Sequence, residues 1–377
     1  MNREIPIYTL EGVPDADVST HYVTTGDKLG LSLLRFWRAD CDDVVMVIHG
    51  LTTSSDMFIM PEHMNLVRYL LDHGFSDVWC FDFRMSNRHP YNLFPHRYTM
   101  DHCAAYDHPA ALAKIREVAG NRRIHVIAHC LGSNTFMMSL AANKVEVASV
   151  IANSVALTPR VPTWSKIKGA VFPFMVERVF SMSYVNPGWA HDPHLSLGKV
   201  FSKIVSAFHR ECDVPACHML SLMWGTGWPA LYDHKNLHEI THKRGADLYG
   251  ATSVNYHRHA VRMARRERAV KMNPGDAQFA DMPDDYAEAG KRIETPVLFM
   301  TGRENRVFTD SNIVNYEMLN AARPGLHELA IFDGYGHQDP FMGKNNHVDI
   351  FPRLVSWLEQ HSGERAQPEP RAAAVGD

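Results

Sequence analysis

Apolar residues along the chain gather in short unbroken runs, and most runs are followed by a segment with helical spacing of its apolar positions. Continuous runs rich in β-branched residues are typical of strands that are buried on both faces of a sheet. Strands that alternate with helices in this way predict a parallel sheet with right-handed crossover connections. The predicted strands are DDVVMVIHG, DVWCFDFR, RIHVIAHC and VASVIANSVAL, and the helices between them include MPEHMNLVRYLLDHG and SNTFMMSLAANK.

Two further stretches extend this pattern toward the ends of the chain. The segment HYVTTGDKLGLSLLRFWR has the alternation of a β-hairpin, with its turn at Gly26–Asp27. The alternation of strands and helices stops near Thr158 and resumes with the strand TPVLFMTG, the strand LHELAIFDGYGH and the helix DIFPRLVSWLEQH. Within MDHCAAYDHPAALAKIREVAG we expect a helix that breaks or restarts at Pro109, because proline has no backbone N–H to donate.

Residues 158–292 interrupt the alternation and differ in composition from the rest of the chain. This block is rich in aromatic residues, Met, Pro and His, and it predicts a mostly helical insertion, which we call the cap segment. Residues 1–157 and 293–363 would then form one α/β core. Residues 364–377 have the low hydrophobicity and the Pro, Ala and Glu content of a disordered tail.

Composition narrows the class of protein. A chain of 377 residues can bury a large core without disulfides or metal ions. Its formal net charge of −4 provides no basic field for nucleic acid. Six cysteines are too few for a disulfide framework, and we find neither a signal-peptide pattern nor an apolar run of the ~18 residues that a membrane span needs. We therefore expect a cytoplasmic protein without a membrane span.

The segment AHCLG, residues 128–132, lies where a predicted strand meets a predicted helix. A nucleophile held in such a strained turn needs very small residues two positions before and after it, here Ala128 and Gly132. Cys130 occupies the nucleophile position. The N-terminus of the following helix would favour a thiolate, so we expect Cys130 to have a depressed pKa and to react quickly with alkylating agents. The alternative is a buried, inert cysteine.

Two other segments supply the groups that such a nucleophile requires. The strand VIHG ends at His49–Gly50, so the next backbone N–H, that of Leu51, can join the N–H of Leu131 in an oxyanion hole. The flexible Gly-rich loop DGYGH after the last predicted strand presents His337 as the general base, because a loop lets an imidazole approach the nucleophile.

The residue that would orient the His337 imidazole is harder to assign. It is expected three residues past the glycine of TPVLFMTG, and Asn305 occupies that position. An amide is compatible with a cysteine nucleophile, since Cys-His-Asn sites occur in proteases. We favour Asn305, with its neighbour Glu304 as the alternative and Asp310 as a remote third choice.

Together these segments resemble the α/β-hydrolase superfamily, whose motifs match VIHGLTTSSDMF, DVWCFDFRMSN, HVIAHCLGS and YGHQDPFMG in the same order. The resemblance covers about 44–157 and 295–360, and it implies an α/β-hydrolase fold with a mostly parallel central sheet and a large helical cap. The cysteine elbow, the YGH-x-D loop, Asn305 and the segment ECDVPACHMLSLMWG are similar to hydrolase domains associated with cholesterol oxidase-type (glucose-methanol-choline) oxidoreductases. In FDFRMSN, Arg84 and Ser86 resemble a structural turn of the family.

The resemblance and the site residues imply an enzyme that passes an acyl group through Cys130. We expect hydrolysis of an ester or thioester through a thioester acyl-enzyme, with no cofactor and with a small-molecule substrate whose acyl chain is apolar. An acyltransferase with an amine, alcohol or thiol acceptor is the alternative, because a dry cap keeps water out. A binding protein on an inactive hydrolase fold is the second alternative, and a carbon–carbon bond hydrolase is a narrower third.

The cap segment also contains residue types that ligate metals. At a spacing of four, its three histidines in YDHKNLHEITHKRG would share one face of a helix, although the segment is equally typical of a polar surface helix. The cysteine pair could instead form a disulfide or pack in the core. We therefore predict no metal site. The residues concerned are Cys212, Cys217, His218, His234, His238 and His242.

Overall fold

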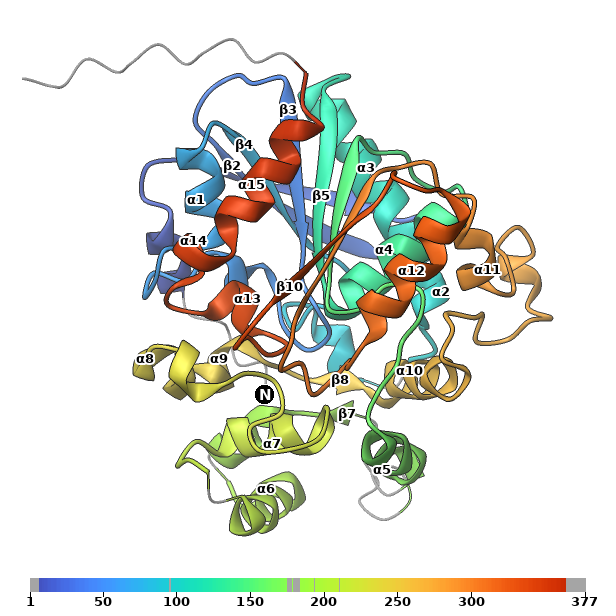
Figure 1. The fold of residues 1–377 in the computed structure, drawn as a ribbon. Helices are drawn as coiled ribbons and strands as arrows, with labels where there is room; N and C mark the ends of the chain where they lie inside the picture. Colours follow the sequence, from blue (N-terminus) through green and yellow to red (C-terminus); the bar gives the residue numbers. More distant parts are fainter. Residues whose placement is uncertain are drawn as a thin grey trace, which may run out of the picture.

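An eight-stranded sheet runs through the centre of the computed structural model, which describes residues 7–94, 96–174, 178, 184–192, 194–209 and 211–363 (Figure 1). β1 and β2 form a hairpin and β2 pairs antiparallel with β4, whereas the other neighbouring strands are parallel. The predicted α/β fold with a mostly parallel sheet is confirmed. In spatial order the strands are β1 (Asp17–Thr24), β2 (Gly30–Trp37), β4 (Asp77–Asp82), β3 (Asp43–Ile48), β5 (Arg123–His129), β6 (Ser149–Asn153), β9 (Val297–Gly302) and β10 (Glu328–Phe332).

The central strands are buried because helices cover both faces of the sheet. Every residue of β3, β4, β6 and β9 is buried, which explains their unbroken apolar runs in the sequence. In Figure 1, α1 and α15 lie together on one side of the sheet, and α3, α4 and α12 lie on the other. These five helices are α1 (Leu66–Asp72), α3 (His108–Ala119), α4 (Cys130–Ala141), α12 (Ser311–Ala322) and α15 (Phe351–Gln360).

The helix that we expected to break or restart at Pro109 passes through a π-helical turn just before that residue, and the α-helix begins again at His108. α2 (Met100–His102) leads into η4 (Cys103–Asp107), and η4 leads directly into α3. The His108 N–H donates to the Cys103 carbonyl, one residue further back than in an α-helix. The wider turn lets Pro109 begin α3, where its missing N–H costs nothing.

The chain between β6 and β9 contains mostly helices and one small sheet. β7 (Tyr184–Val185) pairs antiparallel with β8 (Thr252–Ser253), a feature that the sequence did not predict. Helices α5 to α9 lie together at one end of the central sheet, at the bottom of Figure 1. The proposed boundary of the cap segment stays a prediction. The helices here are α5 (Thr163–Phe174), α6 (Leu197–Phe208), α7 (Pro215–Met223), α8 (Glu239–Lys243), α9 (Gly245–Leu248), α10 (Val254–Arg266) and α11 (Tyr286–Gly290).

Short helical turns complete the described part of the chain. α13 (Asp339–Met342) and α14 (Asn346–Asp349) follow the last strand. No helix within the described ranges is both long and apolar enough to cross a membrane. The predicted tail, residues 364–377, lies outside the described residues. The 3-10 helices are η1 (Ile7–Gly12), η2 (Ser55–Phe58), η3 (Pro90–Leu93), η6 (Pro187–His191), η7 (His234–Asn236) and η8 (Ala277–Phe279).

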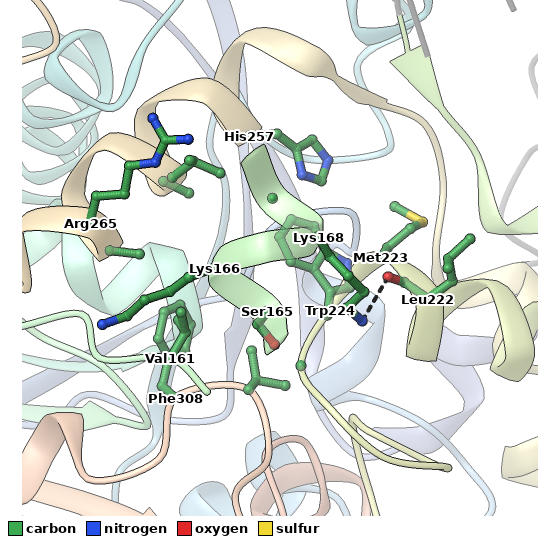
Figure 2. Close-up of a pocket in the computed structure, with 16 residues that line it drawn as sticks. Val161, Ser165, Lys166, Lys168, Leu222, Met223, Trp224, His257, Arg265 and Phe308 are labelled. Carbon is green, nitrogen blue, oxygen red and sulfur yellow. Dashed lines mark hydrogen bonds between the residues drawn. The ribbon is translucent and has the colours of Figure 1, made fainter. Parts of the chain in front are cut away.

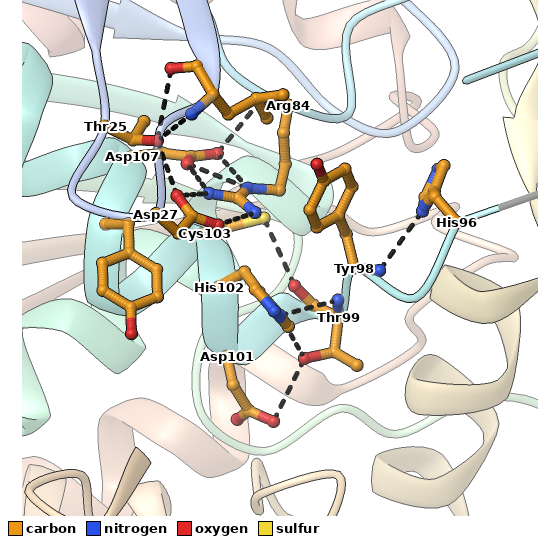
Figure 3. A network of polar contacts seen from close by, with 12 residues as sticks. Thr25, Asp27, Arg84, His96, Tyr98, Thr99, Asp101, His102, Cys103 and Asp107 are labelled. Carbon is orange, nitrogen blue, oxygen red and sulfur yellow. Dashed lines mark hydrogen bonds and ion pairs between the residues drawn. The ribbon is translucent and has the colours of Figure 1, made fainter. Parts of the chain in front are cut away.

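A buried ion-pair network fixes the turn after β4 (Figure 3). The Arg84 side chain is fully buried, and its Nε donates to both carboxylate oxygens of Asp107 at 2.9 Å. Its Nη1 donates to Asp27 Oδ2 at 2.9 Å, which ties the β1–β2 turn to the same cluster. A buried guanidinium needs such partners, since an unpaired charge is costly to bury. Arg84 therefore has the structural role that its sequence motif predicts.

Candidate active site

Cys130 lies in a strained turn between β5 and α4. Its φ is 55°, in the left-handed region that residues with a side chain rarely adopt. The neighbouring backbone is so close that side chains do not fit: a Cβ on Gly132 would lie 2.1 Å from the His49 carbonyl oxygen. A Cβ on Gly50 would lie 2.8 Å from the Cys130 Cβ. The glycines at 50 and 132 therefore follow from the close approach of the start of α4 to the end of β3.

The backbone N–H groups of Leu131 and Leu51 point at the Cys130 sulfur. Burial raises the pKa of the Cys130 thiol to about 12, although these two N–H groups act in the opposite direction. The expectation of a depressed pKa is therefore wrong. Removing the thiolate from water costs more free energy than the helix N-terminus and the two donors recover. The same donors remain available to a carbonyl oxygen that becomes negative next to the sulfur.

His337 lies beside Cys130, with a ring nitrogen within 4.8 Å of the sulfur. The residue is only 2% exposed, and its backbone N–H donates to the Leu231 carbonyl at 3.1 Å. Its loop is thus packed against the cap segment, in contrast to the flexible loop that we expected. Burial lowers the pKa of the His337 imidazole to about 3. The pair at neutral pH is consequently an uncharged thiol and an uncharged imidazole.

The structure does not place the expected orienting residues against His337. The Asn305 Oδ1 accepts hydrogen bonds from the N–H groups of Val307 and Phe308, both at 3.0 Å, and its Nδ2 donates to Thr301 Oγ1 at 3.3 Å. The Asn305 amide therefore closes its own turn, which corrects our assignment. The backbone N–H groups of Val307 and Phe308 compete with an imidazole for this amide oxygen.

Neither of the other two candidates hydrogen-bonds to the His337 Nδ1. Glu304 is exposed, and Asp310 forms an ion pair with Arg160 at 2.8 Å. The His337 Nδ1 has no hydrogen-bond partner among the described residues. The geometry is therefore that of a Cys130–His337 dyad, without the third member that we expected.

His129 is a neighbour of the dyad that sequence reasoning missed. Its ring centroid lies 4.8 Å from that of His337, and its Nδ1 accepts a hydrogen bond of 2.8 Å from the Asn153 amide. Burial is the main cause that lowers the pKa of His129, so this imidazole is also uncharged. Its position next to the nucleophile in the sequence was the available signal.

His129, Cys130 and His337 each offer a metal-ligand atom, all within 4.8 Å of one another. Three such ligands could hold a catalytic zinc ion. However, the Leu51 and Leu131 N–H groups direct their positive ends at the sulfur, where they favour a negative charge over a cation. The trio therefore fits a nucleophile with its base better than a metal centre.

An apolar cavity extends from the dyad into the cap segment. Beside Cys130 and His337, an opening of about 370 Å³ is also lined by Leu51, Thr52 and Gln338. It shares four residues with a larger pocket of about 740 Å³, which lies between α5, α10 and the end of α7 (Figure 2). The four shared residues are Trp224, Ala260, Val307 and Phe308.

Most of the larger pocket is hydrocarbon, with basic groups along part of its wall. Lys168 donates to the Leu222 carbonyl at 3.2 Å, and burial lowers the pKa of its ammonium to about 8 (Figure 2). The His257 ring stacks on Trp224, with centroids 4.5 Å apart. The apolar lining of this pocket suits an apolar part of a ligand.

A cysteine with strained backbone between β5 and α4, two backbone donors and a late histidine have the geometry of a nucleophile elbow on a mostly parallel sheet. Residues 43–342 match the family model described as alpha/beta hydrolase fold. The chain therefore belongs to the alpha/beta hydrolase family, as its sequence motifs implied.

Individual proteins are similar to this chain at lower levels. The lipase lipl-1 of Caenorhabditis elegans is 31% identical over 165 residues, which span 40% of this chain and 40% of that protein. A thermophilic esterase from Thermogutta terrifontis has a TM-score of 0.55 at 13% identity, covering 92% of this chain and 100% of that one. Naproxen esterase from Bacillus subtilis has a TM-score of 0.50 at 15% identity, covering 93% and 94%. At these identities the structural likeness shows the fold alone.

Proposed function

We propose that this protein is an acyl-transferring hydrolase that cleaves an ester or thioester through a Cys130-linked acyl-enzyme. The observation that carries the proposal is the convergence of three groups on one sulfur. Two backbone N–H groups, from Leu51 and Leu131, point at it, and a His337 nitrogen lies within 4.8 Å. A nucleophile, its base and an oxyanion hole in one place are what acyl transfer requires.

The uncharged resting state determines how the reaction would begin. As the Cys130 sulfur attacks the carbonyl carbon, its proton passes to the imidazole of His337, and the carbonyl oxygen becomes an oxyanion held by the Leu51 and Leu131 N–H groups. The imidazolium then gives this proton to the leaving alcohol or thiol, and a thioester remains on Cys130. Water, deprotonated by His337, attacks the thioester, and Cys130 regains its proton as the acid leaves.

The pocket indicates the class of substrate. The lining residues Trp224, Val307 and Phe308 connect the dyad to the larger apolar cavity, so an apolar part of the substrate would lie there. The name of the lipase that is similar to this chain agrees with an ester substrate. A link to cholesterol oxidase-type oxidoreductases, suggested by the sequence motifs, and a cytoplasmic location both remain proposals.

Acyl transfer to an amine, alcohol or thiol is the second candidate. The raised pKa of Cys130 and the lowered pKa of His337 both arise from burial, so the dyad lies in a water-poor site. A thioester in such a site persists long enough to meet an acceptor other than water. The third candidate, a binding protein on an inactive fold, is less well supported because the strained φ of Cys130 serves no purpose in it.

The test is the intact mass of the protein after brief mixing with a panel of acyl thioesters and activated esters. We expect a covalent acyl adduct on the wild type and on a Cys41→Ala control, and none on Cys130→Ala. The adduct is then left in buffer alone or in buffer with an added alcohol or amine. A free acid as product indicates hydrolysis, and an ester or amide of the added acceptor indicates transfer. If no adduct and no turnover appear across the panel, the catalytic proposal fails and the binding protein becomes the better explanation.

A further inference from the structure

Two cysteines and two histidines of the cap segment converge away from the dyad. One ligand atom from each of them lies within 4.8 Å of every other one. They come from separate elements: one cysteine precedes α7, the other lies in α7, and the histidines lie in η7 and α8. The expectation that the histidines share a helix face is wrong, because the chain is extended at His238, with ψ of 147° between the two helices. The four residues are Cys212, Cys217, His234 and His242.

We propose that Cys212, Cys217, His234 and His242 form a structural zinc site. Two thiolates and two imidazoles are one of the standard ligand sets for tetrahedral structural zinc. In such a tetrahedron, neighbouring ligand atoms lie about 3.3–3.8 Å apart, as the zinc–ligand bond lengths require. The Cys217 sulfur and the His234 Nε2 are already 3.4 Å apart, within this range.

The four ligand groups have few competing roles. Both cysteines are free thiols, so neither sulfur is tied up in a disulfide. The His242 Nε2 is buried without a hydrogen-bond partner among the described residues, an arrangement that costs free energy unless something binds there. His218 is different: its Nδ1 bonds to Ser206 Oγ at 3.0 Å, and its Nε2 bonds to the Cys212 carbonyl at 2.8 Å and contacts the Cys212 sulfur at 3.4 Å. It supports the loop that carries Cys212 and is therefore not a ligand.

The charge balance suits a partly buried site. Zinc binding releases one proton from each thiol, while both imidazoles bind in their neutral form. The resulting centre, one Zn²⁺ with two thiolates, carries no net charge and requires no further counter-ion in the protein. Tyr232, which is 4% exposed, hydrogen-bonds to the Cys217 sulfur and would support that ligand from outside the metal.

The position of the site suggests what the metal would stabilise. The segment that contains His234 is hydrogen-bonded to the loop of His337: the Asn236 Nδ2 donates to the Gly334 carbonyl at 2.8 Å and to Asp339 Oδ2 at 2.7 Å. The Asp233 N–H donates to the same Asp339 oxygen at 3.0 Å. A zinc ion that joins α7, η7 and α8 would therefore also brace the loop that positions the base.

Metal content tests this site independently of any acyl chemistry. Full-length protein with its affinity tag removed is freed of loosely bound metal and analysed by mass spectrometry for zinc. We expect about one zinc per chain in the wild type and in Cys130→Ala, and at least a tenfold loss of affinity in Cys212→Ser and in His242→Asn. Cys41→Ser and His238→Asn are the matched controls and should keep their zinc.

If a variant does not fold, replacing zinc by Co²⁺ in the wild-type protein tests the proposed site without any substitution. Co²⁺ bound to the wild type should show thiolate-to-cobalt charge-transfer absorption and the visible bands of tetrahedral coordination. Their absence would overturn the proposal, as would retention of zinc in Cys212→Ser. A wild-type mass two hydrogens lower than calculated, with both thiols blocked to alkylation, would equally overturn it in favour of a disulfide. Loss of zinc should also lower the melting temperature of the wild type and leave that of His242→Asn unchanged.

Discussion

Gly50 faces Cys130 so closely that a Cβ on the glycine would lie 2.8 Å from the Cys130 Cβ and 3.4 Å from its sulfur. The first of these distances is shorter than non-bonded Cβ contacts in proteins. The atoms that the new Cβ would meet belong to Cys130. The end of β3 and the start of α4 can approach in this way only without a side chain at position 50. The Leu51 N–H that points at the sulfur depends directly on this approach.

Gly50→Ala should therefore reduce activity far more than stability. The new methyl group must push either Cys130 or the Leu51 backbone aside, which removes one donor from the oxyanion hole. We expect kcat/KM to fall by about 10²–10³-fold, as for the loss of such a donor, with a cost of about 1–3 kcal/mol in the free energy of unfolding. Gly30→Ala, where a Cβ meets nothing within 4 Å, is the control and should leave both unchanged. Equal activity in the two variants would remove Leu51 from the mechanism.

The dyad should show a flat pH profile around neutrality. With the pKa of Cys130 near 12 and that of His337 near 3, neither group changes its charge between about pH 7 and pH 10. We expect kcat/KM for a non-ionising substrate to be constant across this range. Alkylation of Cys130 by iodoacetamide should be slow at pH 7.5 and should accelerate up to pH 10 and beyond. An alkaline limb with an apparent pKa near 8, or rapid alkylation at neutral pH, would instead indicate a thiolate–imidazolium pair.

Acid should unfold the protein through its buried histidines. A histidine whose pKa is lowered on folding stays neutral in the folded state while the unfolded chain binds a proton below about pH 6.5, so stability is lost as pH falls from there toward 4. At pH 5.5 each such residue removes about 1.4 kcal/mol, and several together approach the whole free energy of unfolding of a domain. Burial lowers the pKa to between about 3 and about 4 in His63, His108, His257, His327 and His337.

Urea unfolding at a series of pH values measures this effect. The midpoint should fall steeply between pH 6.5 and pH 5, and His327→Phe should reduce the slope by about 1.4 kcal/mol per pH unit. His327 is suitable because both its nitrogens are buried without a hydrogen-bond partner within the described ranges. Asp339 acts in the opposite direction, since burial raises its pKa to about 6 and the folded state then holds a proton that the unfolded chain releases. An unchanged slope in His327→Phe would contradict the prediction.

Breaking the buried network at Arg84 should destabilise the fold strongly. Asp107→Asn keeps the shape of the side chain but removes the charge that the fully buried guanidinium faces. We expect the free energy of unfolding to drop by about 3 kcal/mol, because the buried guanidinium loses its fully buried partner and keeps only the Asp27 carboxylate. Asp333→Asn, which removes an exposed partner of Arg303, should cost less than about 1 kcal/mol. Denaturant titrations of the two variants with equal m-values would make the comparison direct.

Asn305→Ala should affect stability rather than catalysis. The substitution leaves the N–H groups of Val307 and Phe308 without their acceptor, at a cost of about 1–2 kcal/mol. We expect kcat/KM to stay within a few-fold of the wild type, whereas His337→Ala should lose about 10²–10⁴-fold. If Asn305→Ala is as inactive as His337→Ala, Asn305 orients the base during the reaction and the site is a triad after all.

Sequence patterns were most informative where the structure is local. The central strands could be predicted from the sequence because each is buried along its whole length, so its apolar run is unbroken. The elbow could be predicted because a side chain at position 132 would collide with the His49 carbonyl oxygen. This steric limit allows only glycine there and so leaves a local signal in the sequence. Leu51 and Leu131 then followed from backbone geometry alone.

Features that depend on distant segments could not be read in this way. Burial raises the pKa of Cys130, and residues far along the chain, such as Trp224 and Leu231 of the cap segment, line the opening beside it, so the helix N-terminus next to it gave the wrong sign. The role of Asn305 depends on whether its amide oxygen accepts from the backbone of its own turn, as at Val307, or from His337. The cysteine and histidine cluster needed the break at His238, which the polar sequence around it does not reveal.

The raised pKa of Cys130 has a consequence for oxidative damage. Peroxides attack thiolates, and at pH 7 a thiol with a pKa of about 12 is ionised in only about one molecule in 10⁵. Cysteine enzymes that rest as ion pairs expose a reactive sulfur at all times, whereas in the mechanism that we propose the Cys130 sulfur becomes nucleophilic only while its proton is leaving for His337. Cys130 should thus remain reduced through oxidant exposures that convert low-pKa catalytic cysteines to sulfenic acid.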